Sequence, residues 1–543
     1  MHLEKKFLLS LLHNANITTK LMKSKDFLKA LYFISISSLI FLSFSACMKT
    51  DSIEVVQELT TSENTQVSQE SGAIETEPTT TEEPKPDFNL VMVPVVPFYT
   101  YNDVIVFDDI KKYWNGDSQS LIYLSNTNEI PELLLNEKTL EIMKKLLGEP
   151  APETPIKLLE VEEILKYSEA NPNTWSIIPF EDLNIRWKVL NFPAISIFNK
   201  ELDISEYPLT ITLGFDEARE IYPEITPDTD ESKLTNREID CLTTLNMTGV
   251  TAMAVGRHIA NRMDEKGVLY PAEKIADTLK DADITHISNE IPFVEGCQGE
   301  KKDSLIFCSR PEYMELLKYV GTDVVELTGN HMNDYGHEAF LKSLALYEKE
   351  GLPCFGGGEN LKDSYEPVII NSNGNKIAFL GFNYWGPTAD WATEDSPGST
   401  PPNSEDLESI IRDLKSQGYI VIFTFQYVET YSYKPTQQQV TDFRKMANAG
   451  ADIVSGSQSH QPVGIEITNN SFINYGMGNL FFSQIMDNIG VKLGIIAKHV
   501  FYKGKHINTI LITTMLEDYC QPRLTTDPER LDLLKSIFSN SIR

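Results

Sequence analysis

The sequence is poor in basic residues and in cysteine. Lys and Arg number 47 against 78 Asp and Glu, which gives a formal net charge of -31. Binding of nucleic acid or of an anionic lipid surface through general electrostatics needs clustered Lys and Arg. The charge balance therefore argues against both, and we expect no nucleic-acid partner. It does not exclude a local basic pocket, because net charge describes the whole surface.

The six cysteines include no C-x-x-C pair, which argues against a zinc ribbon. Cys47 has a separate explanation, given below, so an odd number remains and complete pairing within the chain is impossible. Cys297 and Cys308 flank a short polar loop. They can form a disulfide or stay two free thiols, and their spacing leaves both open.

At 543 residues the chain exceeds what one hydrophobic core usually organises, so we expect two folded domains and non-globular segments. The expected parts are a signal and lipoprotein segment (1–47), a disordered tether rich in Thr, Glu, Ser and Pro (48–88), a small α/β domain (89–235), a larger α/β domain (236–515) and a C-terminal helix or tail (516–543).

Residues 22–47 have the layout of a secretory signal. Three lysines precede an apolar run over 30–44, which is short for a bilayer span, and two small residues then precede Cys47. This order resembles the lipobox of bacterial lipoproteins, with Phe44 where Leu is usual. The resemblance implies that Cys47 is lipidated and anchors the protein at the extracytoplasmic face of a bacterial membrane. Ordinary cleavage and an uncleaved anchor are the alternatives. Met22 begins a complete signal, so we expect the true start there.

The small domain shows strand-like and helical segments in alternation but no visible chemistry. Its pattern resembles part of a periplasmic solute-binding protein. Trp175, Trp187 and Tyr207 are interpreted as packing residues, because large aromatics are more often buried than used to stack a ligand. The polar, turn-rich run over 226–238 is the expected boundary.

The larger domain shows a regular alternation of strands and helices. Its strand-like segments are 245–253, 284–290, 323–330, 376–383, 419–427 and 451–458. The helical segments between them are 271–282, 311–320, 337–351, 404–418 and 437–450. Such an order predicts a largely parallel sheet with right-handed crossovers, whose functional groups collect beyond the carboxyl ends of the strands.

Polar side chains stand at several of these strand ends, namely Asn289, Glu290, Asn330, His331, Gln426, Gln458 and His460. Alone, each is more often a turn, a cap or a surface residue. Their recurrence at one expected edge favours a common site.

Several ordered motifs then resemble one family. ELTGNHMNDYG (326–336) resembles the NNH-x-x-D-x-G motif of the CapA/PgsA family of poly-γ-glutamate and capsule biosynthesis proteins. ISNEIP (287–292) resembles the family's NLE-x-P, and AGADIVSGSQSHQP (449–462) resembles its GAD-x-x-x-GHHPH. INYGMGNLFF (473–482) resembles its YSLGNF-x-F segment. The likeness covers about Asn246 to Phe482.

The resemblance implies a calcineurin-like metallophosphatase fold, a four-layer α/β/β/α sandwich that holds a binuclear metal centre in its enzymes. Glu290 would match the acidic bridging position and Asn330 an asparagine ligand. His331 would match the acid that protonates a leaving group, and His460 the last histidine ligand. Asp334 matches the aspartate of the same motif.

Three positions depart from the family pattern. Thr251 or Val250 stands where an aspartate belongs, and Gln426 and Gln458 stand where histidines belong. Divalent ions at such sites are held by carboxylate and neutral imidazole, so glutamine amides are poor substitutes. An ordinary two-metal mechanism is therefore not expected. The alternatives are no metal cofactor, or one weakly bound divalent ion held by Glu290, Asn330 and His460.

The predicted site divides into two groups of residues. The predicted catalytic residues are Glu290, His331 and His460, with Glu290 and His331 as base and acid. The predicted substrate-binding residues are Asn289, Asn330, Asp334, Gln426 and Gln458, whose amides suit amide or carbonyl groups. If the protein is an enzyme, it would be a hydrolase or transferase acting on an amide- or ester-linked polymer.

The leading functional hypothesis is a surface-anchored participant in synthesis, transfer or attachment of an extracellular anionic polymer of the poly-γ-glutamate or capsule kind. Its expected partners are the membrane, that polymer or another envelope component, and other membrane proteins of polymer synthesis. The alternatives are a non-catalytic lipoprotein that binds the envelope or its polymer, and a metal-dependent phosphoesterase. The last rests on fold alone.

Overall fold

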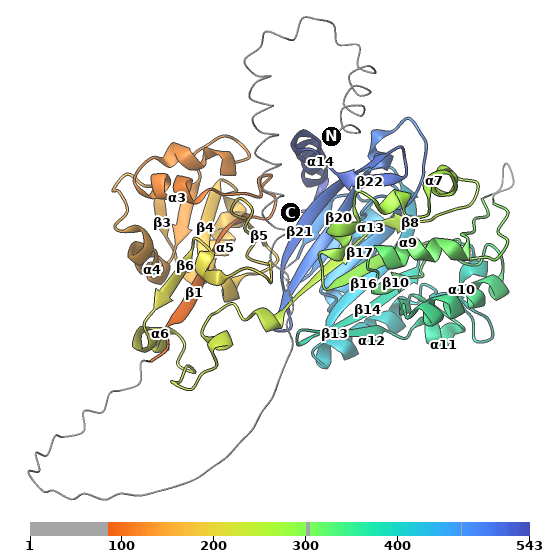
Figure 1. Cartoon of the computed structure of the whole chain (residues 1–543), viewed down its shortest axis with the longest axis horizontal. Coiled ribbons are helices and arrows are strands. Elements are labelled where there is room, and N and C mark those ends of the chain that lie inside the picture. The colour runs from red at the N-terminus through yellow and green to blue at the C-terminus, as the bar shows by residue number, and fades with distance from the viewer. Residues whose placement is uncertain (1–84, 300–304, 469) are drawn as a thin grey trace, which may run out of the picture. The chain divides into compact units, whose positions relative to one another are not determined.

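The computed structural model describes residues 85–299, 305–468 and 470–543 (Figure 1). The signal segment, Cys47 and the tether as far as residue 84 lie outside the described residues. No helix within the described ranges is both long and apolar enough to cross a membrane.

The first part of the described chain is built on a six-stranded sheet of order β3-β2-β4-β1-β5, with β6 paired to β1. Its strands are β1 (Phe88–Pro97), β2 (Glu132–Leu135), β3 (Ile156–Leu158), β4 (Thr174–Pro179), β5 (Trp187–Val189) and β6 (Thr210–Leu213). The helices between them are α3 (Phe107–Trp114), α4 (Glu137–Leu147), α5 (Val161–Ala170) and α6 (Phe215–Ile221).

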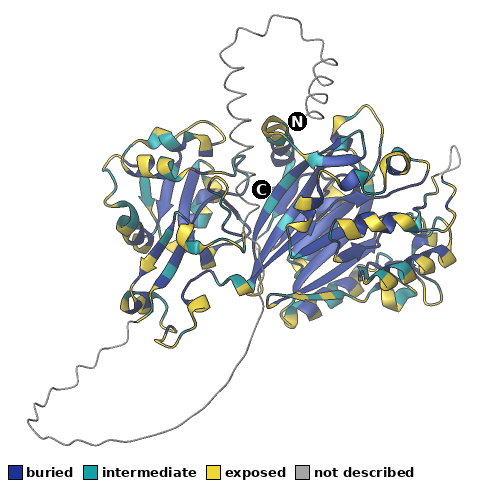
Figure 2. Ribbon diagram, in the orientation of Figure 1, coloured by how far each residue is buried: buried dark blue, intermediate teal, exposed yellow. Residues whose placement is uncertain are grey.

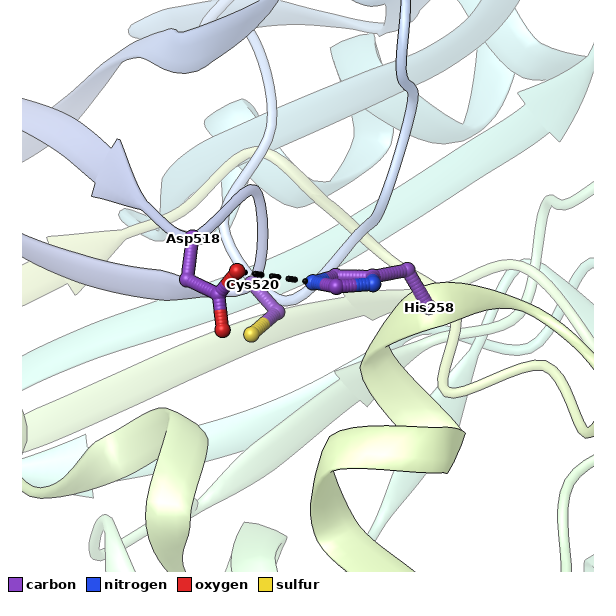
Figure 3. A group of neighbouring side chains, drawn as sticks. All are labelled: His258, Asp518 and Cys520. Carbon is purple, nitrogen blue, oxygen red and sulfur yellow. Dashed lines mark hydrogen bonds and ion pairs between the residues drawn. The ribbon is translucent and has the colours of Figure 1, made fainter.

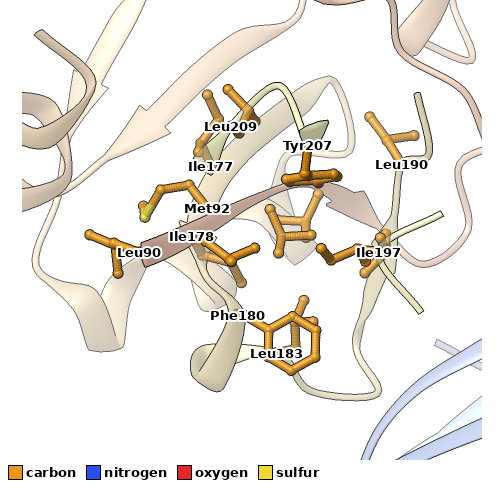
Figure 4. Packing of buried hydrophobic residues seen from close by; sticks show 14 of the residues in the cluster. Leu90, Met92, Ile177, Ile178, Phe180, Leu183, Leu190, Ile197, Tyr207 and Leu209 are labelled. Carbon is orange, nitrogen blue, oxygen red and sulfur yellow. The ribbon is translucent and has the colours of Figure 1, made fainter. Parts of the chain in front are cut away.

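Buried apolar residues of this sheet form one core (Figure 4). Met92 of β1 and Ile177 of β4 belong to it, as do Trp175, Trp187 and Tyr207, which are at most 3% exposed. The interpretation of these three aromatics as packing residues is therefore confirmed.

An eight-stranded sheet of order β11-β10-β9-β7-β20-β21-β22, with β8 paired to β9, begins the larger part. Its strands are β7 (Leu242–Met247), β8 (Val250–Thr251), β9 (Ile284–Asn289), β10 (Val324–Glu326), β11 (Cys354–Phe355), β20 (Leu493–Tyr502), β21 (Lys505–Glu517) and β22 (Gln521–Leu524). From β7 through β9 and β10 to β11 the pairing is parallel, and from β7 through β20 to β22 it is antiparallel.

A second six-stranded sheet has the order β13-β14-β16-β17-β19-β18. Its strands are β13 (Val368–Ser372), β14 (Asn375–Asn383), β16 (Ile420–Thr430), β17 (Ile453–Ser459), β18 (Ile465–Ile467) and β19 (Phe472–Asn474). The four central strands are parallel, as the strand–helix alternation predicts. A small separate ladder joins β12 (Gly357–Gly358) and β15 (Gly398–Ser399).

Helices accompany these sheets. The α-helices are α7 (His258–Lys266), α8 (Ala276–Lys280), α9 (Met314–Tyr319), α10 (His337–Glu350), α11 (Leu361–Ser364), α12 (Ser404–Ser416), α13 (Gln437–Ala449) and α14 (Asp527–Asn540). Short 3₁₀ helices join elements along the chain, namely η1 (Ser118–Leu124), η2 (Phe180–Asp182), η3 (Ile204–Glu206), η4 (Glu231–Lys233), η5 (Ile239–Cys241), η6 (Tyr270–Ala272), η7 (Pro311–Tyr313), η8 (Thr388–Asp390) and η9 (Ile489–Lys492).

Alternation of side chains along the strands produces the layers. In β14, Ile377 and Phe379 belong to a core that also holds residues of the eight-stranded sheet, so the two sheets face each other there. The neighbouring Ala378 and Leu380 pack on α12 and α13 instead, because successive strand residues point to opposite faces. The outer face of the eight-stranded sheet packs on α7 to α10. The sheets are buried and the helices expose their outer sides (Figure 2). The predicted α/β fold, a four-layer sandwich preceded by a smaller α/β part, is confirmed.

The structure corrects the predicted bounds of one helix and of the larger domain, and it settles whether Cys297 and Cys308 are paired. The expected helix over 271–282 is the short helix η6 followed by α8, and α7 before it was not predicted. The eight-stranded sheet continues to Leu524, past the residue 515 at which we expected the larger domain to end. A disulfide joins Cys297 to Cys308.

Candidate functional site

A cleft of about 310 Å³ opens at the edge where β8, β9, β16 and β17 end. The register carries the strand ends to this edge together, since Thr251 of β8 pairs with Asn289 of β9 and Gln426 of β16 pairs with Ser457 of β17. The residues lining the cleft are Ala252, Ala254, Arg257, Glu290, Ile291, Leu305, Phe307, Asn330, His331, Trp385, Glu429, Gln458, His460, Phe482, Ser483 and Gln484. Five of the predicted site residues are among them.

A network of amides lies at the floor of the cleft. Nε2 of the buried Gln426 is 2.9 Å from Oε1 of Glu290, and 2.8 Å from both Oδ1 of Asn330 and Oε1 of Gln458. The amide nitrogen carries two hydrogens and therefore cannot donate to three oxygens at once. One of the three oxygens is thus always available to accept a hydrogen bond from a ligand.

Gln458 has a backbone conformation that a side chain rarely adopts. Its φ is 68°, in the left-handed region, although it lies within β17. Such a conformation costs about 1 kcal/mol or more in a residue with a Cβ, and strained residues of this kind cluster at functional sites. The strain is offset by the surrounding structure and directs the Gln458 amide to Gln426.

His331 is held by a carboxylate. Its Nδ1 lies 2.8 Å from Oδ2 of Asp334, and the same oxygen accepts a 2.6 Å hydrogen bond from the Phe307 amide nitrogen. Burial alone would lower the pKa of His331. The hydrogen bond to Asp334 and the charges of Glu290, Asp334 and Asp390 oppose burial and leave the pKa above its ordinary value. A proton is therefore retained on His331 to higher pH than on a free histidine, as general acid catalysis requires.

A second carboxyl group near His331 was not predicted from the sequence. Asp390, at the end of η8, is 2% exposed, and its Oδ2 has no hydrogen-bond partner among the described residues. Burial and the charge of Asp334 raise the pKa of Asp390 to about 7, although His331 acts in the opposite direction. This carboxyl therefore titrates near neutral pH.

His460 is fixed in orientation. Nδ1 of His460 lies 2.9 Å from Oδ1 of Asn479, whose Nδ2 donates to the carbonyl oxygens of His460 and Val491. Because Oδ1 of Asn479 can only accept, Nδ1 of His460 carries the hydrogen and Nε2 is the free acceptor of the neutral ring. The ring is stacked on Phe482, with centroids 4.6 Å apart.

Three predicted substrate-binding residues, Asn289, Asp334 and Gln426, are not among the lining residues, although Gln426 contacts three that are. Asn289 is buried, and its Nδ2 donates to the Ile291 carbonyl oxygen at 2.7 Å and to Oη of Tyr347 at 2.8 Å. We therefore remove Asn289 from the substrate-binding set. Asp334 also does not line the cleft, and acts there through His331.

The donor atoms do not fit a binuclear metal centre. A hydrogen-bond donor, Nε2 of Gln426, lies among the oxygens of Glu290, Asn330 and Gln458. At the position of the missing aspartate, Thr251 is buried and its hydroxyl has no hydrogen-bond partner among the described residues. Among the described residues, no three His, Cys, Asp or Glu side chains at this cleft bring their ligand atoms within 4.8 Å of one another, so they do not form a binuclear centre. A single weakly bound ion at Glu290, Asn330 and His460 stays a prediction.

Several cleft residues were not found from the sequence. Arg257 lies 4.8 Å from the centre of the Phe307 ring, and Glu429 lies 4.0 Å from Nε2 of His460. Both follow a predicted strand closely in the chain, so the strand-end argument could have included them. Trp385 and Phe307 lie in loops, for which periodicity gives no signal.

Fold and site together define a four-layer α/β sandwich with a cleft at its strand ends, whose floor holds a network of amide side chains. Residues 244–484 match the family model of the bacterial capsule synthesis protein PGA_cap. The likeness of this part of the chain to the CapA/PgsA family, inferred from its motifs, is confirmed by this match.

Two relatives show the extent of the likeness. The capsule biosynthesis protein CapA of Bacillus anthracis is 30% identical over 247 residues, which cover 44% of this chain and 60% of that protein. The PGA biosynthesis protein CapA of Bacillus subtilis (strain 168) is 26% identical over 242 residues, covering 44% and 64%. The chain thus spans less than two thirds of these relatives.

Among solved structures, the 5'-nucleotidase precursor of Thermus thermophilus matches with a TM-score of 0.32 and 11% identity, over 53% of this chain and 55% of that one. A likeness this low says nothing about activity.

Proposed function

We propose that this protein takes part in the synthesis, transfer or attachment of an extracellular anionic polymer with amide linkages, of the poly-γ-glutamate or capsule kind. The likeness to this family supports the role in polymer synthesis. We choose an amide-linked polymer because the Gln426 amide nitrogen lies within hydrogen-bond distance of three oxygens, those of Glu290, Asn330 and Gln458.

The amide network supports recognition of a peptide-like linkage. Because one of the oxygens of Glu290, Asn330 and Gln458 is always unpaired, the floor of the cleft accepts a hydrogen bond from an amide N–H of the polymer. A phosphodiester has no N–H donor, and the side chains at the floor of the cleft do not fit the two metal ions that phosphoester hydrolysis uses in this fold. The network therefore favours amide over phosphoester substrates.

The neighbouring residues support chemistry on that linkage. His331, with its raised pKa, is positioned by Asp334 to give a proton to a leaving amine. His460 presents the acceptor Nε2 and Glu290 a carboxylate to the same cleft. We assign Glu290 or His460 the role of base and His331 the role of acid.

We also propose that the protein is anchored to the membrane through a lipid. Lipidation at Cys47 would hold the cleft at the extracytoplasmic face of the membrane, where a polymer is exported and attached. The partners would be the growing polymer and the membrane proteins that make it.

The proposal is tested by calorimetric titration of the full chain with a γ-linked glutamate oligomer. We expect binding that weakens about fivefold in Gln426→Ala, because Gln426 orients the three oxygens that accept from the ligand and one hydrogen bond is worth about 1 kcal/mol. Gln417→Ala is the matched control, since Gln417 directly follows α12, does not line the cleft, and donates its amide hydrogen bond to Asp413. Equal binding by wild type and Gln426→Ala, or tighter binding of a phosphodiester polymer, would contradict the proposal.

A further inference from the structure

A second group of potential ligand atoms lies outside the cleft (Figure 3). His258 is the first residue of α7, and Asp518 and Cys520 belong to the turn between β21 and β22. One ligand atom from each, a histidine nitrogen, a carboxylate oxygen and Sγ, all lie within 4.8 Å of one another. No family motif and no part of the proposed function uses these residues.

The donor set selects the kind of ion. Sulfur and imidazole favour zinc or a similar transition metal over calcium and magnesium, which take oxygen ligands. In a tetrahedral zinc site, metal–ligand bonds of about 2.0 to 2.3 Å place the ligand atoms about 3.5 Å apart. The three ligand atoms therefore need to move about 1 Å closer to one another to bind zinc. The two anionic groups, a carboxylate and a thiolate, neutralise the charge of the ion.

The surroundings orient these ligands. Oδ2 of Asp518 lies 2.7 Å from Nε of Arg262, whereas Oδ1 faces Nε2 of His258 at 3.1 Å. Nη2 of Arg262 is farther from Oδ1, at 3.4 Å. One carboxylate oxygen is thus held by the arginine and the other is directed to the histidine. Outer partners of this kind commonly fix the ligands of metal sites.

The turn that carries two of the ligands has an uncommon backbone. Asp518 and Tyr519 have φ values of 48° and 53°, a pair of conformations for which turns usually employ Asn and Gly. The turn is also tied to the cleft, because Oγ of Ser483 donates to the Tyr519 carbonyl oxygen at 2.8 Å. Ser483 and Arg257, which precedes His258, both line the cleft.

We propose that His258, Asp518 and Cys520 bind one zinc ion, which joins the start of α7 to the β21–β22 turn. The fourth coordination position is left for water or an added ligand. The ion stabilises the wall of the cleft that contains Arg257 and Ser483, without taking part in its chemistry.

Cobalt(II) serves as the probe, because a cobalt–thiolate bond gives a charge-transfer absorption band that reports sulfur ligation directly. The full chain, stripped of metal with a chelator, is titrated with Co²⁺ and then with Zn²⁺. We expect a thiolate band that saturates at one equivalent and disappears when Zn²⁺ displaces Co²⁺. Cys520→Ser should abolish the band. Cys354→Ser, which removes another free thiol, should retain it.

Two further variants make the outcome decisive. His258→Ala, at a partly exposed position, should weaken Co²⁺ binding by more than the roughly 10- to 100-fold that loss of an outer partner costs. If Cys520→Ser does not fold, the Co²⁺ affinity of His258→Ala tests the metal site instead. Glu290→Gln, in the cleft, should leave the band unchanged. No thiolate band in wild type, or the same Co²⁺ affinity in His258→Ala, would overturn the proposal.

Discussion

Nε2 of Gln426 lies 2.9 Å from Oε1 of Glu290. An amide nitrogen next to the cleft's buried glutamate thus provides a hydrogen-bond donor at a position where the motif that the sequence resembles has a histidine. The carboxylate therefore faces a neutral hydrogen-bond donor, and its remaining acceptor positions stay available to a ligand. This contact links the substitutions in the sequence to the polymer-binding chemistry that we propose.

Removal of the His331 side chain should abolish function and leave the fold nearly intact. His331 is a partly buried loop residue whose imidazole bonds Asp334, so His331→Ala should cost about 1 kcal/mol of unfolding free energy. His337→Ala, an exposed position on α10, is the control. Activity is read as cell-bound polymer in the host strain, and stability by denaturant unfolding. Severe destabilisation with unchanged polymer would assign His331 a purely structural role.

The pH dependence of stability should reveal the protonation of His331. Its pKa is raised in the folded protein, so its contribution is fully present below the unfolded pKa of about 6.5 and is lost as pH rises through the folded pKa. The stability difference between wild type and His331→Gln should therefore shrink with rising pH. In Asp334→Asn, NMR titration should show a lower pKa for His331. An unchanged pKa in that variant would exclude Asp334 as its cause.

Asp390 should destabilise the protein as pH rises. Its folded pKa of about 7 lies above the unfolded value of about 3.9, so only the unfolded state ionises between these two values. Stability should fall over this window, and Asp390→Asn should remove that fall. Unfolding free energies of both proteins at pH 5 and pH 8 test this. A parallel fall in Asp390→Asn would mean that other groups cause it.

The strain at Gln458 is tested by a pair of variants. Gln458→Gly and Gln458→Ala both lose the amide, but glycine adopts a φ of 68° without penalty. The glycine variant should be more stable than the alanine variant by about 1 kcal/mol. Equal stability of the two in denaturant unfolding would show that the backbone is not strained there.

The sequence predicted six strand segments of the larger domain, those of β7 to β8, β9, β10, β14, β16 and β17, because their hydrophobic runs and flanking turns are local. It did not predict the antiparallel strands β20, β21 and β22. The position of Glu290, Asn330 and Gln458 in one cleft also followed, since parallel strands bring their carboxyl ends to one edge. Asn289 could have been excluded from the same argument, because adjacent residues of an extended chain point to opposite sides.

Other parts of the site depend on tertiary packing. The raised pKa of Asp390 comes from burial of a loop, which no local pattern records. The helix α7 was missed because it is mostly polar and packs through Ile259, Ala260 and Met263 only. The contacts of Gln426 with three separate strand ends likewise required the folded chain.

Anchoring should depend on Cys47. Cys47→Ala should leave the precursor unprocessed or release the protein from the membrane fraction, whereas Cys241→Ser, the control, should behave as wild type. A protein that begins at Lys85 should be soluble without detergent, because β1 begins at Phe88 and the strands that pair with it are all retained. Fractionation and immunoblotting measure both. Unchanged processing and anchoring of Cys47→Ala would exclude lipidation at this residue.

The metal content of the cleft tests the central claim most directly. The family resemblance implies that Thr251, Gln426 and Gln458 stand where metal ligands belong. The Cys520→Ser variant, which lacks a ligand of the proposed zinc site, should therefore hold less than one equivalent of manganese, zinc or iron by elemental analysis. Its hydrolysis of a generic phosphoester should stay at background when those metals are added. Two tightly bound metal ions per chain, with metal-stimulated phosphatase activity lost in Glu290→Gln, would contradict the account.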